Sequence, residues 1–301
     1  WVHAEDTTLG ADNGIAVALA LALAESDVPH PALEILVTVD EETGLTGAQN
    51  LREGWLQGTQ LLNIDSEDEG VFTVGCAGGR DTIFTYRVDL EPLPADLTVR
   101  EIAVAGLQGG HSGVDIHLGR ANANVLLVRL LSALLGGDDP VSLRIAGIRG
   151  GNAHNAIPRD AAAVVAAPAG EFQRVEAEVA RLRDVFRAEY GDLEPGLDLV
   201  LRTVAAPTDV YTPESARGLV DLVSAIPHGV MRMSSDVPGL VETSTNLATI
   251  RPRNDTVEIK TSQRSSYRSR LAELAGRLES IARLAGATVR SESSYPPWEP
   301  H

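Results

Sequence analysis

Four acidic residues lie at the ends of predicted helices or strands: Asp12, Glu41, Glu42 and Asp65. The two glutamates come shortly after the apolar run LEILVTV, and Asp65 directly follows the run QLLNI. Carboxylates gathered at neighbouring strand ends repel one another unless a cation or a proton compensates. No lysine lies near them in the sequence, so we expect a divalent metal ion to compensate here. One adjacent glutamate could then bind the ion while the other acts as a general base on activated water.

Three further residues have types suited to substrate contact. His111 lies in the glycine-rich GGHSG, Asn155 lies in HNAIPRD, and Arg264 follows an expected strand. An imidazole and an amide can contact a substrate oxygen or an oxyanion, and an arginine can hold a carboxylate with two hydrogen bonds. Each can also be explained without a function: His111 as a loop histidine, Asn155 as a turn asparagine and Arg264 as a surface arginine. Asp12 can likewise be explained as the cap of a helix, so none of these residues is persuasive by itself.

The elements that must position these residues change in character near Arg80. Before it, helices over 14–24 and 47–56 alternate with buried strands over 33–39 and 60–64, which is typical of an open, mostly parallel α/β sheet. Such sheets bind ligands at the carboxyl ends of their strands. After it, the order strand, helix, strand, strand, helix predicts an α+β module of ferredoxin-like type, followed by a second, similar passage. The predicted strands cover 81–89, 99–105, 142–148, 161–167, 199–204, 241–250, 256–263 and 288–291, and the predicted helices cover 121–135, 171–189, 213–225 and 265–284.

Composition excludes several classes of protein. The chain has 301 residues, of which 44% are hydrophobic, so it can bury a sizeable core. A formal net charge of -17 disfavours general binding to nucleic acid or to anionic membrane surfaces. The single cysteine, Cys76, excludes a thiolate metal cluster, so a metal here must be held by oxygen and imidazole. No apolar run reaches the length of a membrane span.

Taken together, the motifs resemble a known family. TTLGADNG, EETGLTGA, NIDSEDEG, GCAGG, GGHSG, NAIPRDA and VETSTNLA occur in this order across nearly the whole chain. They are similar to the Xaa-His dipeptidases (aminoacyl-histidine dipeptidases), relatives of the carnosinases among the co-catalytic zinc metallopeptidases. The resemblance implies an α/β catalytic domain with an inserted α+β ferredoxin-like lid and dimerisation domain. It also implies hydrolysis of carnosine-like dipeptides with two divalent ions, zinc before manganese or cobalt.

The resemblance assigns roles to individual residues. It makes Asp12 the bridging metal ligand, Glu42 and Asp65 terminal ligands, and Glu41 the general base. In the lid it places substrate contacts on His111, Asn155 and Arg264, with His111 reaching the partner subunit's site in a homodimer. It further implies a cis peptide bond after Asp12.

Two family ligands have no counterpart here. These are the histidine of an H-x-D strand motif and the histidine of an H-x-G-x-E segment; His3 and His301 lack these contexts. We therefore expect a fragment, which can be inactive by itself, with 1–79 a partial catalytic domain, 80–293 the lid and dimerisation domain, and 294–301 a return toward the catalytic domain. Cytoplasm is the default location, because no targeting segment is visible.

Two rival functions remain open. The same fold could serve an N-acyl amino acid deacylase or another short-peptide hydrolase, since related folds share the metal set. The chain could instead be a non-catalytic dimerisation module. Preference for Xaa-His peptides over N-acetyl amino acids would separate the enzymes, and the oligomeric state would test the module.

Overall fold

A computed structural model describes residues 2–7, 9–65, 70–136 and 139–299, without the side chains of Glu42 and Thr43. The chain divides into two units, Trp1–Thr73 and Val74–His301, which are taken separately below. No helix in the described ranges is long and apolar enough to cross a membrane.

The first unit contains helices joined by irregular chain. The helices are α1 (Ala11–Glu25), α2 (Glu41–Gly44) and α3 (Thr46–Gln49). The predicted helix over 14–24 is confirmed as part of α1, whereas the one over 47–56 is reduced to α3. The peptide bond between Asp12 and Asn13 is cis, as the resemblance implied.

The prediction of a mostly parallel sheet in the first unit is wrong for the residues that the structure describes. Residues 33–39 and 60–64 form no strand there. A strand persists only when a neighbouring strand satisfies its N–H and C=O groups, and no such partner is described within this unit. The apolar side chains of these two segments are exposed to solvent: Val37 is 62% exposed and Leu62 is 84% exposed.

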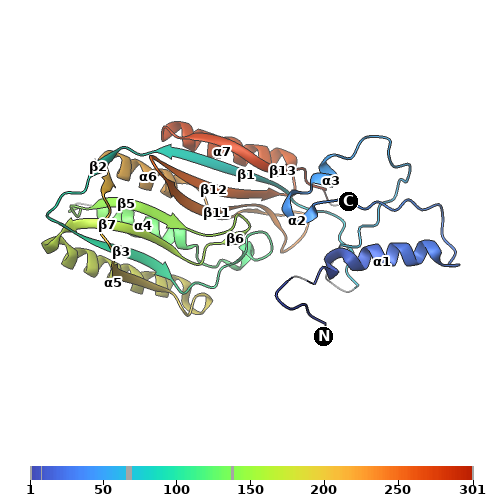
Figure 1. Ribbon diagram of the computed structural model, residues 1–301, viewed down its shortest axis with the longest axis horizontal. Helices are drawn as coiled ribbons and strands as arrows, with labels where there is room; N and C mark the ends of the chain where they lie inside the picture. Colours follow the sequence, from blue (N-terminus) through green and yellow to red (C-terminus); the bar gives the residue numbers. More distant parts are fainter. Residues whose placement is uncertain (1, 8, 66–69, 137–138, 300–301) are drawn as a thin grey trace. The chain divides into compact units, whose positions relative to one another are not determined.

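The second unit is an α+β domain built on a large antiparallel sheet (Figure 1). Its strands are β1 (Gly78–Arg87), β2 (Leu90–Pro92), β3 (Leu97–Ala105), β4 (Gly110–His111), β5 (Arg144–Gly150), β6 (Ala156–Ile157), β7 (Ala161–Pro168), β8 (Asp198–Thr203), β9 (Asp209–Tyr211), β10 (Gly229–Met233), β11 (Val241–Arg253), β12 (Thr256–Ser265) and β13 (Thr288–Tyr295). Its α-helices are α4 (Ala123–Leu135), α5 (Phe172–Tyr190), α6 (Pro213–Ala225) and α7 (Arg268–Leu284), with short 3-10 turns η1 (Ile116–Leu118), η2 (Ala169–Glu171) and η3 (Gly191–Leu193).

The main sheet contains the same topology twice. Its order is β13-β1-β12-β11-β5-β7-β3-β8, with β10 added beside β11. The first module is β3-α4-β5-β7-α5-β8, and the second is β1-α6-β11-β12-α7-β13. Both have the β-α-β-β-α-β succession of the ferredoxin-like fold, and each runs from its second strand through its third and first to its fourth. The first module is inserted in the second, between β1 and α6.

The two modules join edge to edge through their second strands. Ile250 of β11 pairs with Gly150 of β5. Gly151, next to this pair, has φ of 67°, and a Cβ there would meet the backbone oxygen of Ala248. Only glycine therefore suits this junction without strain.

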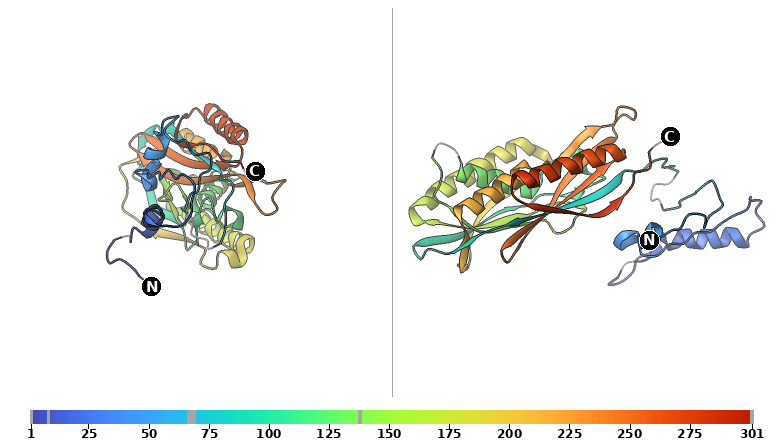
Figure 2. Two further views of the ribbon diagram at one scale, coloured as in Figure 1. Left: turned by 90° about the vertical axis from the view of Figure 1, so that its right-hand side faces the viewer. Right: turned by 90° about the horizontal axis from the view of Figure 1, so that it is seen from above.

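The α-helices of the second unit, α4, α5, α6 and α7, cover one face of the main sheet and leave its other face without helices of this unit (Figure 2). A continuous apolar core lies between helices and sheet, with Phe84, Leu127 and Phe186 fully buried. Local capping explains where two helices begin: Asn122 accepts from the backbone of Asn124 and Val125 at the start of α4, and Thr212 accepts from Ser215 before Pro213 of α6.

His228 gives the fold a pH-dependent stability. Burial lowers its pKa to about 4. Its Nδ1 faces the Asn122 Nδ2 at 3.2 Å, and an amide nitrogen can only donate, so the imidazole is neutral with its proton on Nε2. The unfolded chain takes up this proton near pH 6.5, well before the folded chain does. Stability is therefore complete above pH 6.5 and falls as the pH drops toward 4.

We expect the difference in unfolding free energy between pH 7 and pH 4 to shrink by up to about 3 kcal/mol in His228→Gln. Urea unfolding of the wild type and of His228→Gln across this pH range measures the effect. Carboxylates that titrate in the same range contribute equally to both proteins, so their contribution cancels when the two unfolding free energies are subtracted. Parallel pH profiles for the two proteins would contradict the assignment.

Candidate functional site

His111 lies in the second unit, where the short strand β4 pairs with β6. His111 is opposite Ala156, and Asn155 immediately precedes that strand. The His111 Nδ1 accepts the backbone N–H groups of Gly113 at 3.2 Å and Val114 at 3.1 Å. Its Nδ1 therefore carries no proton, and Nε2–H is left to donate to a ligand.

The charge state of His111 follows from its surroundings. Burial is the main cause that lowers its pKa, and the nearby Arg264 lowers it further, against the opposing effect of Asp115. His111 is therefore neutral at neutral pH. A neutral imidazole with Nε2–H is a donor for a carbonyl oxygen or an oxyanion.

The three residues predicted from sequence to contact substrate meet in one cluster of the second unit. The backbone oxygen of Asn155 accepts from Ser112 N at 2.8 Å, which ties the two loops together. Arg264 contributes to the lowered pKa of His111, and both side chains lie against Gly113: a Cβ built on Gly113 would be 3.1 Å from each. Residues far apart in sequence thus form one site.

Tyr295 helps to hold Arg264 and was not predicted from sequence. Arg264 Nη1 donates to the Tyr295 hydroxyl at 3.2 Å. The phenol can lie there because Gly79 of the GCAGG motif has no side chain; a Cβ on Gly79 would come within 2.5 Å of it. Gly79 therefore leaves room for the Tyr295 ring, a role that the motif alone did not reveal.

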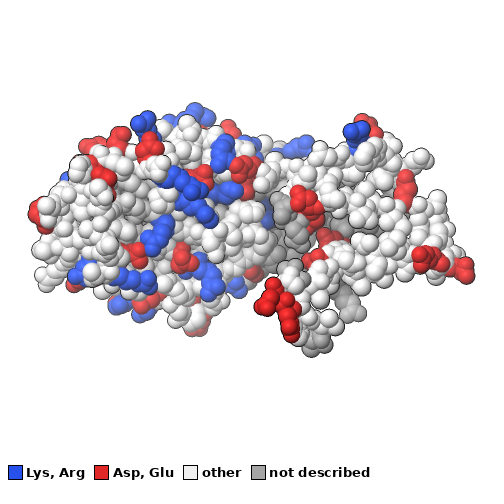
Figure 3. Space-filling view, in the orientation of Figure 1, with Lys and Arg blue, Asp and Glu red and all other residues white. Residues whose placement is uncertain are grey.

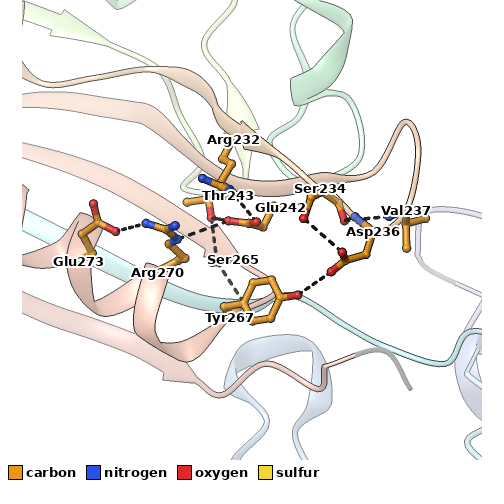
Figure 4. A network of polar contacts seen from close by, with 11 residues as sticks. Arg232, Ser234, Asp236, Val237, Glu242, Thr243, Ser265, Tyr267, Arg270 and Glu273 are labelled. Atoms are coloured by element: carbon orange, nitrogen blue, oxygen red, sulfur yellow. Dashed lines mark hydrogen bonds and ion pairs between the residues drawn. The ribbon is translucent and has the colours of Figure 1, made fainter.

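A polar network fixes the chain directly after Arg264 (Figure 4). The buried Glu242 accepts from Arg232 Nε at 2.9 Å, and its backbone oxygen accepts from Ser266 N at 2.9 Å. Ser265 and Thr243 share a hydrogen bond of 2.9 Å between their hydroxyls. These contacts bind the end of β12 to β11, and Arg264 also pairs with Gly79 of β1, so the backbone that carries Arg264 is held on both sides.

Polar atoms around this cluster are left without partners in the described structure. They are Ser112 Oγ, Asn246 Oδ1 and Arg264 Nε, all shielded from solvent. Asn246 Nδ2 donates to Ala156 O at 2.8 Å, so the amide is tied to β6 beside Asn155. Buried polar groups that lack partners are rare, and a ligand or water that supplies partners is the usual explanation.

A second histidine, His154, also belongs to this neighbourhood and was missed by sequence reasoning. Its Nδ1 lies 3.2 Å from Asp81 Oδ2, on a carboxylate that is only 2% exposed. The signal was available, because His154 directly precedes Asn155 in the HNAIPRD motif. What the motif could not reveal is Asp81, which is far away in the sequence.

The predicted carboxylates lie in the first unit, which is described by itself. Asp65 Oδ1 accepts from Asn13 Nδ2 at 3.2 Å, so the residue after Asp12 is held against Asp65. Glu41 begins the short helix α2 and is exposed. The side chain of Glu42 lies outside the described residues.

These carboxylates suit a divalent ion in the type of donor they offer, because oxygen ligands are what zinc and manganese accept beside imidazole. Among the described side chains, however, no three from His, Cys, Asp and Glu are grouped around a metal position. The hydrogen bond between Asn13 and Asp65 thus brings Asp12 and Asp65 into one neighbourhood, and the side chains that the structure describes there do not by themselves make up a metal site.

Part of the second unit matches the model of a known protein family. Residues 102–194 match the peptidase dimerisation domain of the M20 peptidases. This match spans most of the first module, from within β3 to η3.

Two relatives align with the whole chain. The cytosol non-specific dipeptidase of Escherichia coli is 40% identical over 301 residues, which are 100% of this chain and 61% of that protein. The crystal structure of aminoacylhistidine dipeptidase from Vibrio alginolyticus is also 40% identical, with a TM-score of 0.88, and the match again covers 100% of this chain and 61% of that one. The chain therefore spans about three fifths of the length of each relative, and the resemblance to dipeptidases is confirmed.

Proposed function

Residues 102–194 belong to the M20 peptidase dimerisation domains, and from that premise we propose that the whole protein is a metal-dependent dipeptidase acting on Xaa-His peptides. The observation that carries the proposal is the alignment of all 301 residues with a dipeptidase and with an aminoacylhistidine dipeptidase, each at 40% identity. The cluster of His111, Asn155 and Arg264 supports it, because a carboxylate and a carbonyl oxygen both find donors there.

In this proposal Asp12, Glu42 and Asp65 hold two divalent ions, zinc first. Bound there, the ions supply Lewis acidity that makes water a nucleophile at neutral pH. Glu41 accepts the proton of the attacking water and returns it to the leaving amine. The hydrogen bond between Asn13 and Asp65 supports the pairing of Asp12 with Asp65.

The lid residues bind and orient the peptide. His111, neutral and with its proton on Nε2, donates to the oxygen of the scissile carbonyl as negative charge develops on it. Asn155 adds a second donor, and Arg264 holds the carboxylate at the end of the substrate. In the proposed homodimer through the dimerisation domain, His111 serves the partner subunit. We place the protein in the cytoplasm, since the Escherichia coli relative is named a cytosol dipeptidase.

Hydrolysis of β-alanyl-histidine by the purified whole protein tests the function. We expect activity that a chelator removes and that added zinc or manganese restores, and little release of amino acid from N-acetyl-histidine. Preference for the N-acetyl compound would replace the dipeptidase by a deacylase. Sedimentation at several concentrations checks the homodimer.

Arg264→Lys isolates the recognition of the substrate carboxylate. A lysine keeps the charge but cannot make the two parallel hydrogen bonds of a guanidinium, and it loses the contact with Tyr295. We expect KM for β-alanyl-histidine to rise by about tenfold to hundredfold with a smaller change in kcat. The same substitution should matter much less for β-alanyl-histidine amide, which has no carboxylate. An equal loss for both substrates would assign Arg264 to another role.

A further inference from the structure

The loop residue His154 faces a buried carboxylate, that of Asp81. The Asp81 carboxylate beside it is buried in β1, and Lys260 Nζ lies 3.5 Å from the same Oδ2. Lys260 in turn lies 3.3 Å from Glu292 of β13. Three strands of the second module thus fix the carboxylate that His154 meets, on the open face of the sheet (Figure 3), where other Lys and Arg side chains also gather.

This contact determines where the imidazole carries its proton. With Oδ2 at 3.2 Å, a lone pair on Nδ1 would face a carboxylate, so the proton of the neutral ring lies on Nδ1. Asp81 Oδ2 is shielded from solvent and has no aligned hydrogen-bond donor among the described residues; the nearest groups that can donate to it are His154 Nδ1 at 3.2 Å and Lys260 Nζ at 3.5 Å. The Nε2 of neutral His154 is then an acceptor.

The two histidines of the cluster are therefore complementary. His111 receives backbone N–H groups at Nδ1 and presents Nε2–H, a donor. His154 faces a carboxylate with Nδ1 and presents an Nε2 lone pair, an acceptor. They are close enough for His154 to affect the titration of His111, and the His154 side chain is half exposed, so a ligand can reach it.

We propose that His154 is a specificity residue whose Nε2 accepts an N–H from the side chain of the substrate's C-terminal residue, and that Asp81 is its positioning residue. Beside Arg264, which offers donors for a carboxylate, this acceptor fits a residue that carries both a carboxylate and a side-chain N–H. Histidine is such a residue and leucine is not. The inference rests on the proposed function and names the feature that selects its substrate.

The first experiment compares the ratio of kcat/KM for β-alanyl-histidine to that for β-alanyl-leucine in the whole protein. We expect His154→Leu to lower this ratio by about tenfold to hundredfold, since a site that hydrogen-bonds its substrate discriminates against analogues that cannot respond. His154→Gln, which keeps an acceptor, should retain part of the preference. His117→Leu is the matched control: His117 is an exposed histidine in the turn η1, away from the loop of His154, and its ring contacts Val114 O.

The second experiment reads the tautomer without catalysis. Nitrogen NMR of the histidine rings should show His154 with its proton on Nδ1, and added L-histidine, unlike L-leucine, should shift the Nε2 signal. Asp81→Asn should move the proton to Nε2, because an amide can donate to Nδ1, and should lower the preference as His154→Leu does.

The outcomes separate this inference from the function on which it rests. An unchanged ratio in His154→Leu, or a wild-type ring with its proton on Nε2, overturns the role of His154 while dipeptide hydrolysis stands. Absence of dipeptide hydrolysis in the wild type overturns the proposed function, and the NMR titration with L-histidine still decides whether His154 binds the ligand.

Discussion

Replacing Glu41 by glutamine in the whole protein should lower kcat for β-alanyl-histidine by about a thousandfold or more. The amide has nearly the shape of the carboxylate but cannot accept a proton at neutral pH. Substrate binding does not require that proton transfer, so KM should change far less than kcat. Steady-state kinetics of the wild type and of Glu41→Gln at saturating zinc measures the two constants.

The control for Glu41→Gln separates a general base from a metal ligand. Elemental analysis after dialysis should find the same metal content in the variant as in the wild type, whereas Asp65→Asn should lower it. Glu53→Gln removes one exposed carboxylate from the same unit and should leave the kinetics unchanged. A variant at Glu41 that keeps more than a tenth of the wild-type kcat would exclude the base role.

The helices and long strands of the second unit could be predicted because the features that indicate them lie within each segment of sequence. Helix α6 runs over the predicted residues, where Thr212 caps it and Pro213 occupies the first turn. The long strands of the second unit also lie close to their predicted positions, since each is long enough for its pattern of apolar residues to stand out in the sequence. The short pairs β2–β9 and β4–β6 escaped prediction because two or three residues carry no periodicity.

The first unit shows what an apolar run cannot determine. LEILVTV has the composition of a buried strand, yet residues 33–39 form none in the described structure. An apolar run indicates that its side chains favour burial. A strand also needs a neighbouring strand that hydrogen-bonds its backbone N–H and C=O groups. Where the partner comes from is a property of the whole fold.

The residues of the candidate site were likewise only partly predictable from the sequence. Motifs indicated His111, Asn155 and Arg264, and the structure brings them together. They did not indicate Tyr295 or Asp81, since these residues meet the cluster only through the register of β1 with β12 and β13. Positioning residues are therefore harder to predict than contact residues, because strand pairing rather than local sequence selects them.

Asn122→Ala should destabilise the second unit more than an ordinary loss of a helix cap. The side chain is 1% exposed and its oxygen caps α4, while its Nδ2 donates to Leu247 O at 3.0 Å and to His228 Nδ1. Leu247 O keeps a second donor, Asn124 Nδ2 at 3.2 Å, so its loss is partial. The buried His228 Nδ1 loses the amide that donates to it. Together the cap and this bond predict a loss of about 3 kcal/mol in unfolding free energy.

Two matched substitutions show which part of Asn122 matters. Thr212→Ala removes a cap alone, from α6, and should cost about 1 kcal/mol. Asn122→Ser keeps an oxygen for the cap but loses the amide donors, so it should fall between the two. Urea midpoints of the three variants at pH 7 give the comparison. Because Asn122 links α4 of the first module to β11 of the second, a loss no greater than that of Thr212→Ala would mean that this link adds nothing to the cap.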